Sequence, residues 1–176
     1  MKERLGEAFE FDEKLTVVGA RLKPGDEAPE FTLDWMNPET SMLEQLSLSQ
    51  TAGSIRLLNV VNSLDTPVCQ VETRTWEQML SEMPEGLVIY TITMDLPFAV
   101  DRWTQEFGVT HKVLSSHRSE QFGKDYGVLL KEWRMLQRSV FILDADGVIR
   151  YVEYVDDQMR EPDYDSAADA VTRLAS

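Results

Sequence analysis

A chain of 176 residues, 43% of them hydrophobic, is long enough to bury a sizeable core, and we expect a single domain over residues 1–176. Its 17 lysines and arginines against 31 aspartates and glutamates give a net charge of −14, which argues against a nucleic-acid partner because such a surface repels phosphate. The single cysteine excludes an internal disulfide and favours a reducing compartment.

The sequence also argues against a membrane partner. No window approaches the roughly 18 apolar residues of a membrane span, and the charged start MKERLGEAFEFDEK lacks the apolar region of a secretory signal. We therefore expect a cytoplasmic protein.

The first third of the chain shows strand patterns separated by turn signals. Alternating apolar and polar residues over 9–19 predict a β-hairpin. Residues 23–29 are turn-forming, 30–35 predict a short strand, and 37–54 are interpreted as a loop with at most one helical turn. The continuous apolar run 55–64 is typical of a central strand buried on both faces.

A helix is predicted after Pro67, through the stretch VCQVETRTWEQMLSEM, and the following Pro-Glu-Gly ends it. Its periodicity predicts that one face carries Val68, Val71, Thr75, Met79 and Met83.

The second half alternates strands and helices. Residues 86–95 predict a buried strand, 96–109 a short helix, 111–117 a third strand and 119–128 a third helix. They are followed by a strand pair over 139–155, joined by the turn sequence Asp-Ala-Asp-Gly.

A C-terminal helix is predicted over 161–175. The resulting order, βαβαβα followed by a hairpin and a helix, implies right-handed crossovers and a mainly parallel sheet. We predict an α/β fold of thioredoxin type, a mixed sheet flanked by helices, with an N-terminal β-hairpin.

Cys69 is the candidate reactive residue. It lies near the first turn of the helix that follows the central strand, where ligands and reactive groups collect in such folds. Free backbone N–H groups and the helix dipole favour a negative charge there, and only the thiolate is a nucleophile. Thr66 stands three residues earlier, so its hydroxyl either contacts a substrate oxygen or caps the helix.

The segment IRLLNVVNSLDTPVCQVETR resembles the active-site segment of the peroxiredoxins, specifically the thiol peroxidase branch, whose signature is P-x-x-x-T-x-x-C. Segments 94–103, 112–128, 137–149 and 161–167 also resemble that branch, in the right order. The resemblance implies a thioredoxin-like peroxiredoxin fold, and it covers nearly the whole chain.

The resemblance implies a role for three residues. Cys69 corresponds to the peroxidatic cysteine, which attacks the peroxide and becomes a sulfenic acid. Thr66 corresponds to the threonine that binds the peroxide, and Arg138 to the arginine that stabilises thiolate and transition state. It also implies a homodimer with an interface near the active-site loops.

Two departures from the family are visible. Asn62 stands where the signature has proline, which either is tolerated drift or alters the site. Thr104 stands where the branch usually has its resolving cysteine, so an outside thiol must reduce the sulfenic acid. Glu72, one turn after Cys69, complements the helix dipole but also repels a thiolate.

No cofactor or metal is expected. His111 and His117 have no acidic, cysteine or histidine partners at the spacing of metal ligands, and we interpret them as surface or strand-end residues.

The main hypothesis is a thiol peroxidase that reduces hydrogen peroxide or alkyl hydroperoxides by a one-cysteine mechanism, with an external thiol or thioredoxin-like protein as reductant. The alternative is a redoxin-fold sensor or binding module with weak or no turnover, which loss of the proline and the second cysteine favours. A thiol–disulfide oxidoreductase is a weaker third reading because CxxC is absent.

Overall fold

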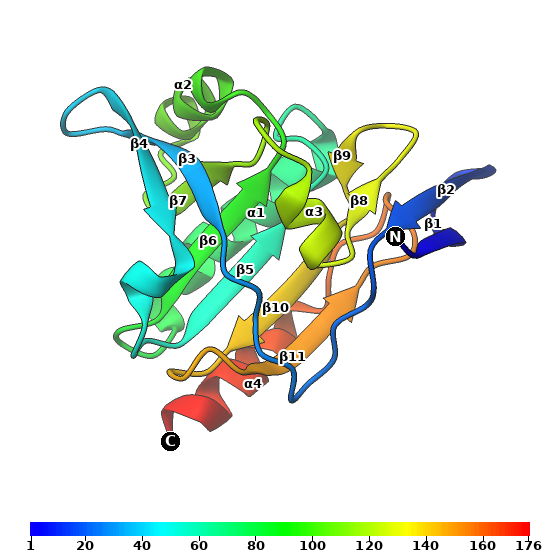
Figure 1. Ribbon diagram of the computed structural model, residues 1–176. Coiled ribbons are helices and arrows are strands. Elements are labelled where there is room, and N and C mark those ends of the chain that lie inside the picture. Colours follow the sequence, from blue (N-terminus) through cyan, green and yellow to red (C-terminus); the bar gives the residue numbers. More distant parts are fainter.

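The computed structural model describes residues 1–176 and is built around a seven-stranded sheet with strand order β11-β10-β5-β6-β7-β3-β4 (Figure 1). Its centre consists of three parallel strands, β5 (Arg56–Val60), β6 (Val88–Thr93) and β7 (Lys112–Ser115). All five residues of β5 are buried, as a strand covered on both faces requires. The predicted parallel centre of the sheet is confirmed.

Antiparallel strands extend the sheet beyond β5. The strand β10 (Ser139–Leu143) pairs with β5 on one side and with β11 (Ile149–Tyr154) on the other, which confirms the strand pair predicted over 139–155. Every residue of β10 is buried. This strand therefore begins, at Ser139, in the interior of the molecule and next to the end of β5.

The opposite edge of the sheet differs from the prediction. The strand β3 (Thr32–Asn37) pairs with β4 (Met42–Ser47), and the 3-10 helix η1 (Leu48–Thr51) follows directly. The prediction of a loop over 37–54 is therefore wrong for residues 42–47, whereas η1 is the one helical turn that it allowed. Only Leu46 of β4 is buried, so this edge strand lacks the alternation that identifies a half-buried strand in a sequence.

Helices cover both faces of the sheet. One face carries α1 (Pro67–Met79), α2 (Pro97–Phe107) and α4 (Tyr164–Ala175), and the other carries the short α3 (Gln121–Asp125) (Figure 1). All four predicted helices are present, and η2 (Leu80–Glu82) prolongs α1 by a tight turn. None of these helices is both long enough and apolar enough to cross a membrane.

The predicted apolar face of α1 is wrong. Val71 is 50% exposed, and the residues that the helix buries are Cys69, Glu72, Thr73 and Trp76. A periodicity rule assigns glutamate to the solvent side, because a buried carboxylate is rare unless it is paired. Here Arg138, immediately before β10, supplies the partner that makes burial of Glu72 possible.

A second, four-stranded sheet contains β1 (Glu3–Glu10), β2 (Glu13–Val18), β8 (Leu129–Leu130) and β9 (Met135–Leu136). The predicted N-terminal hairpin is confirmed, although β1 begins six residues earlier than the pattern over 9–19 indicated. The strands β8 and β9 have only two residues each, which is too short for a sequence pattern.

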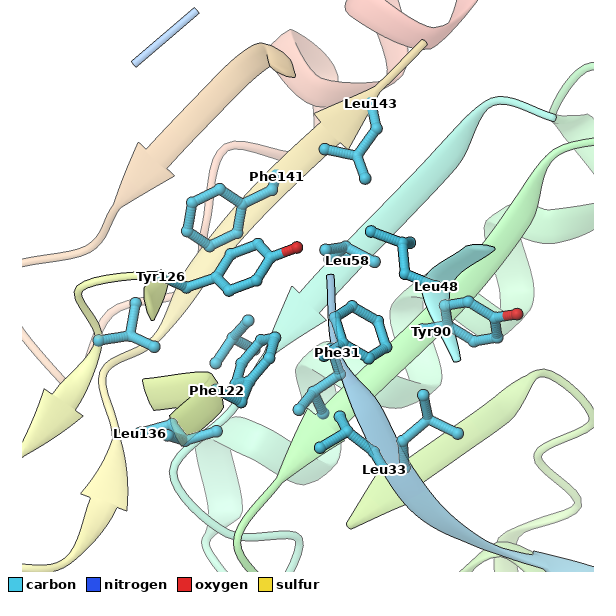
Figure 2. Packing of buried hydrophobic residues seen from close by; sticks show 14 of the residues in the cluster. Phe31, Leu33, Leu48, Leu58, Tyr90, Phe122, Tyr126, Leu136, Phe141 and Leu143 are labelled. Carbon is cyan, nitrogen blue, oxygen red and sulfur yellow. The ribbon is translucent and has the colours of Figure 1, made fainter. Parts of the chain in front are cut away.

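The core on the α3 face is aromatic (Figure 2). Phe31 meets Phe122 edge to face with ring centroids 5.4 Å apart, and Tyr126 meets Phe141 in the same way at 5.2 Å. Edge-to-face pairs add to the stabilisation that burial provides. Phe141 lies in β10, so this packing fixes the strand that follows Arg138.

Candidate active site

Cys69 lies where the central strand turns into a helix. Val61 to Asp65 form the connection after β5, Thr66 is the N-cap of α1, and Pro67 is the first helical residue. Pro67 suits that position because its fixed φ is helical and its missing N–H has no partner there anyway. Cys69 is thus the third residue of a 13-residue helix, as predicted, and its side chain has no exposed surface.

The connection before Cys69 is held by Asp95, which follows β6. The Ser63 hydroxyl donates to Asp95 Oδ1 at 2.8 Å, and the Leu64 N–H donates to Oδ2 at 2.8 Å. Nothing in the local sequence identified Asp95 as part of the site. It fixes the loop because β5 and β6 are neighbouring parallel strands whose carboxyl ends meet at one edge.

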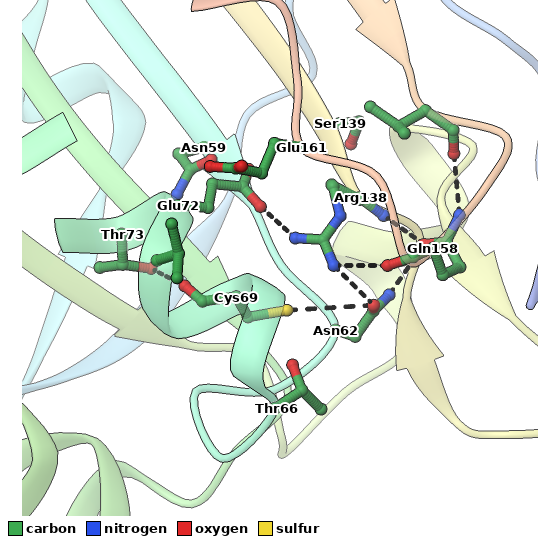
Figure 3. A network of polar contacts seen from close by, with 12 residues as sticks. Asn59, Asn62, Thr66, Cys69, Glu72, Thr73, Arg138, Ser139, Gln158 and Glu161 are labelled. Carbon is green, nitrogen blue, oxygen red and sulfur yellow. Dashed lines mark hydrogen bonds and ion pairs between the residues drawn. The ribbon is translucent and has the colours of Figure 1, made fainter. Parts of the chain in front are cut away.

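Arg138 reaches the same place from the other side of β5. It precedes β10, is fully buried, and donates to Asn62 Oδ1 at 3.3 Å and to the Gln158 carbonyl at 2.8 Å through Nη2 (Figure 3). Its Nη1 forms an ion pair with Glu72. The structure therefore brings Cys69 and Arg138 into one network, in which Asn62 contacts both.

Asn62 occupies the centre of this network (Figure 3). Its Oδ1 lies 3.9 Å from Cys69 Sγ, and its Nδ2 donates to the Leu136 carbonyl at 2.6 Å and to Gln158 Oε1 at 2.9 Å. The residue is 5% exposed. The substitution at the signature position has therefore placed a buried, fully hydrogen-bonded amide beside the cysteine.

Glu72 is the unexpected charge of the site. Its position one turn after Cys69 left open whether it helps the helix or opposes a thiolate, and the structure shows it paired with Arg138 in the interior. Burial raises the pKa of Glu72, and the charge and hydrogen bond of Arg138 oppose that rise. One carboxylate oxygen, Oε1, and Arg138 Nε have no hydrogen-bond partner.

Gln158 is a site residue that no pattern in the sequence singled out. It lies in the connection after β11, where its Nε2 donates to the Val155 carbonyl at 2.8 Å and its Oε1 accepts from the Arg138 N–H at 2.9 Å. These bonds fix the orientation of its amide. Its role depends on a fold that brings the end of β11 next to the start of β10.

Thr66 keeps its hydroxyl at the site instead of capping the helix. Its Oγ1 donates to the Ser63 carbonyl at 2.8 Å, and no side-chain bond to the first helical amides is present. The hydroxyl hydrogen is committed to Ser63, so the oxygen lone pairs remain to accept a hydrogen bond. This geometry favours substrate contact over the capping interpretation.

A cavity of about 370 Å³ adjoins these residues. It combines the polar side chains of the network with an apolar wall, and it is lined by Glu10, Asn62, Thr66, Pro67, Val68, Trp133, Met135, Arg138, Gln158 and Met159. Cys69 does not line it, because the sulfur lies behind its neighbours. The cavity therefore reaches the polar network but not the sulfur itself.

Thr104 does not belong to this cavity. It lies on α2, where its hydroxyl donates to the Asp101 carbonyl at 3.0 Å, and it lines a separate cavity between α2 and β3. Cys69 is the only cysteine, and it is unpaired.

The two histidines have structural partners. His111, just before β7, is buried instead of lying on the surface, and its Nδ1 contacts Glu77 Oε2 at 2.6 Å. His117 lies 3.9 Å from Asp34 Oδ2 and is partly exposed. Neither belongs to a group of three or more His, Cys, Asp or Glu side chains suited to hold a metal ion.

Known proteins with similar sequences belong to one family. The redoxin family model matches residues 23–168. The thiol peroxidase of Streptococcus parasanguinis is 40% identical over 91% of this chain and 94% of its own length, and that of Bacillus subtilis is 38% identical over 91% and 93%. This chain is a redoxin of the thiol peroxidase branch.

Solved structures of related proteins have the same fold as this chain. A peroxiredoxin-like protein from Aquifex aeolicus aligns with a TM-score of 0.79 and 33% identity, covering 92% of each chain. A thiol peroxidase from Chromobacterium violaceum aligns with a TM-score of 0.83 over 98% of each chain, and at 24% identity this likeness concerns the fold alone. The predicted thioredoxin-like peroxiredoxin fold is confirmed.

Proposed function

We propose that this redoxin reduces hydrogen peroxide or alkyl hydroperoxides through Cys69 and is then regenerated by an external thiol. The observation that carries the proposal is the network at the start of α1, where the only cysteine shares Asn62 with a buried arginine. Membership of the thiol peroxidase branch supports it, and so does the cavity beside the network.

In the first step the Cys69 thiolate attacks one peroxide oxygen. The O–O bond breaks, an S–O bond forms, and the leaving oxygen takes a proton to become water or an alcohol, so that sulfur is oxidised to a sulfenic acid and the peroxide is reduced. Arg138 stabilises the negative charge that passes from sulfur to the leaving oxygen. Thr66 accepts the hydrogen bond of the peroxide O–H, since its own hydrogen is used by Ser63.

Regeneration requires two external thiols because Thr104 has no sulfur. The first thiol condenses with the sulfenic acid, which releases water and leaves a mixed disulfide on Cys69. The second attacks that disulfide, restores the Cys69 thiol and leaves with the first as an oxidised disulfide. A small thiol or a thioredoxin-like protein supplies these electrons, and no cofactor takes part.

We further propose a cytoplasmic homodimer formed by a single-domain chain. The lone cysteine supports a reducing compartment. Val71 on α1, Leu96 at the N-cap of α2 and Phe98 on α2 are large apolar side chains that are 50%, 55% and 62% exposed, and a partner subunit would cover them. Sedimentation equilibrium of the wild type and of Phe98→Glu tests this, since a dimer that uses this surface dissociates in the variant.

A second candidate is a redox sensor or binding module. Its support is the complete burial of Cys69 and the contact of its sulfur with an amide oxygen, which are not features of a freely accessible nucleophile. In this case Cys69 is oxidised once or forms one mixed disulfide, and no catalytic turnover follows.

The second-order rate constant of Cys69 with hydrogen peroxide distinguishes the two candidates. Stopped-flow tryptophan fluorescence gives the rate, intact mass identifies the sulfenic acid, and Cys69→Ser is the blank. Trp76 on the same helix and Trp133 at the cavity are the expected reporters. A rate many orders above that of free cysteine, with turnover on adding thiol, supports the peroxidase, whereas a rate near that of free cysteine rejects it.

A further inference from the structure

The Asn62 amide has only one orientation that its neighbours accept. Its Nδ2 faces two acceptors, the Leu136 carbonyl and Gln158 Oε1. Gln158 cannot reverse its own amide without loss, because Nε2 donates to the Val155 and Asp156 carbonyls while Oε1 accepts from the Arg138 N–H. Turning Asn62 over would therefore place its oxygen against two other oxygens in a buried site, which is costly.

The fixed orientation points the Asn62 carbonyl oxygen toward both Cys69 and Arg138. Cys69 donates its S–H toward this oxygen at 3.9 Å, and Arg138 Nη2 donates to it at 3.3 Å. An acceptor that bonds the thiol stabilises the neutral form, and its lone pairs oppose a thiolate at the same place. The same oxygen also accepts an N–H of Arg138, so Asn62 links the thiol to the arginine.

From this geometry we infer that Asn62 restrains the reactivity of Cys69, as a positioning residue whose amide oxygen accepts the hydrogen bond of the Cys69 thiol. The inference rests on the proposed peroxide chemistry of Cys69 for its rate effect. It extends that function because it assigns to Asn62, oriented by Gln158, an effect on the reactivity of Cys69.

The other charged groups near the sulfur do not account for this restraint. Glu72 lies on the same helix but is paired with Arg138, Asp95 accepts hydrogen bonds from the loop before Cys69, and Glu10 reaches the cavity from β1. None of these carboxylates makes a hydrogen bond to Cys69, whereas Asn62 does.

Two substitutions at position 62 should act in opposite directions. Asn62→Ala removes the acceptor, so we expect peroxide oxidation to be about five to ten times faster and the pH midpoint of thiolate absorbance near 240 nm to fall by about one unit, the effect of one lost hydrogen bond. Asn62→Asp keeps the shape and adds a negative charge beside sulfur, so the rate should fall and the midpoint should rise. Cys69→Ser provides the absorbance baseline.

Asn59→Ala is the matched control, because Asn59 is an equally buried amide of β5 that contacts Trp76 and Thr91 instead of the site. It should lower stability while leaving the thiolate midpoint unchanged. Opposite shifts of the midpoint in Asn62→Ala and Asn62→Asp support the inference even if neither protein turns over peroxide, in which case only the peroxidase proposal fails. The inference is overturned if the pH midpoint is unchanged in both variants or shifts in the same direction in both. A slower reaction in Asn62→Ala also overturns it.

If Asn62→Ala does not fold, Asn62→Ser serves the same purpose, because its shorter side chain retracts the acceptor from Cys69. A midpoint equal to that of the wild type in Asn62→Ser overturns the inference, and a lower midpoint supports it.

Discussion

The helix α1 buries two polar networks that differ in kind. Toward its C-terminal end, Trp76 Nε1 donates to Asn59 Oδ1 at 3.1 Å, and Asn59 Nδ2 donates to Thr91 Oγ1 at 3.1 Å. Thr91 contacts His111 Nε2 at 2.9 Å, and His111 Nδ1 contacts Glu77 at 2.6 Å. A neutral histidine with its hydrogen on Nδ1 satisfies every member of this chain.

The network at the N-terminal end of α1 is incomplete. Glu72 Oε1 and Arg138 Nε have no partner, and Cys69 makes one long contact through sulfur. Fully satisfied buried networks rigidify a fold, whereas an unsatisfied buried polar group marks strain, a bound water or ion, or a redox or catalytic role. The same helix is therefore anchored by a complete network at one end and carries the reactive cysteine beside an incomplete network at the other.

The largest effect is expected for Arg138→Ala. Removing the guanidinium should lower the peroxide rate constant of Cys69 by about 100-fold or more, since preorganised donors contribute about that much. It also leaves Glu72 buried without its partner, which costs about 3–5 kcal/mol of unfolding free energy. Stopped-flow fluorescence and urea unfolding measure the two effects, and a rate within threefold of the wild type contradicts the role assigned to Arg138.

Asn59→Ala should affect stability alone. It leaves Trp76 Nε1 and Thr91 Oγ1 without their common partner, and we expect a loss of about 2–3 kcal/mol. The rate constant of the folded protein should change by less than twofold. If this variant slows peroxide oxidation by much more than twofold, the two networks are not separate.

Glu77→Gln tests the pH dependence of the anchored end. Burial tends to raise the pKa of Glu77, but hydrogen bonds from His111 and Thr110 outweigh it and lower the pKa to about 2. A carboxylate with a depressed pKa stabilises the fold at pH values above its unfolded pKa, and this contribution disappears as the pH falls toward 2.

The variant should lose about 1–2 kcal/mol at pH 7, after allowance for the partial exposure of Glu77. Its stability should also vary less between pH 4.5 and 2 than that of the wild type. Urea unfolding at several pH values measures both, and parallel pH curves for the two proteins contradict the assignment.

Thr104→Ala should have the smallest effect. The hydroxyl bonds only the Asp101 carbonyl within its own helix, so the free energy of unfolding should change by less than about 0.5 kcal/mol. The peroxide rate constant should remain within twofold of the wild type, because Thr104 lines a different cavity from the Cys69 network. A large change in the rate constant would show that α2 contributes to peroxide oxidation.

The position of Cys69 could be predicted from the sequence, because local rules govern it. The apolar run before it, Pro67 at the first helical position and the alternation of strands and helices are all set by neighbouring residues. The pattern also predicted the parallel centre of the sheet and the hairpin of β10 and β11, since β-branched and aromatic runs with a turn between them specify their own pairing.

Tertiary structure alone decided how the site is completed. Gln158 and Asp95 join it through strand pairings far apart in the chain, and no local pattern marks either residue. The burial of Glu72 reversed the predicted face of α1 because an arginine 66 residues away neutralises it. The orientation of the Asn62 amide likewise depends on partners from two other segments, because a hydrogen-bonded side chain is oriented by what surrounds it in space.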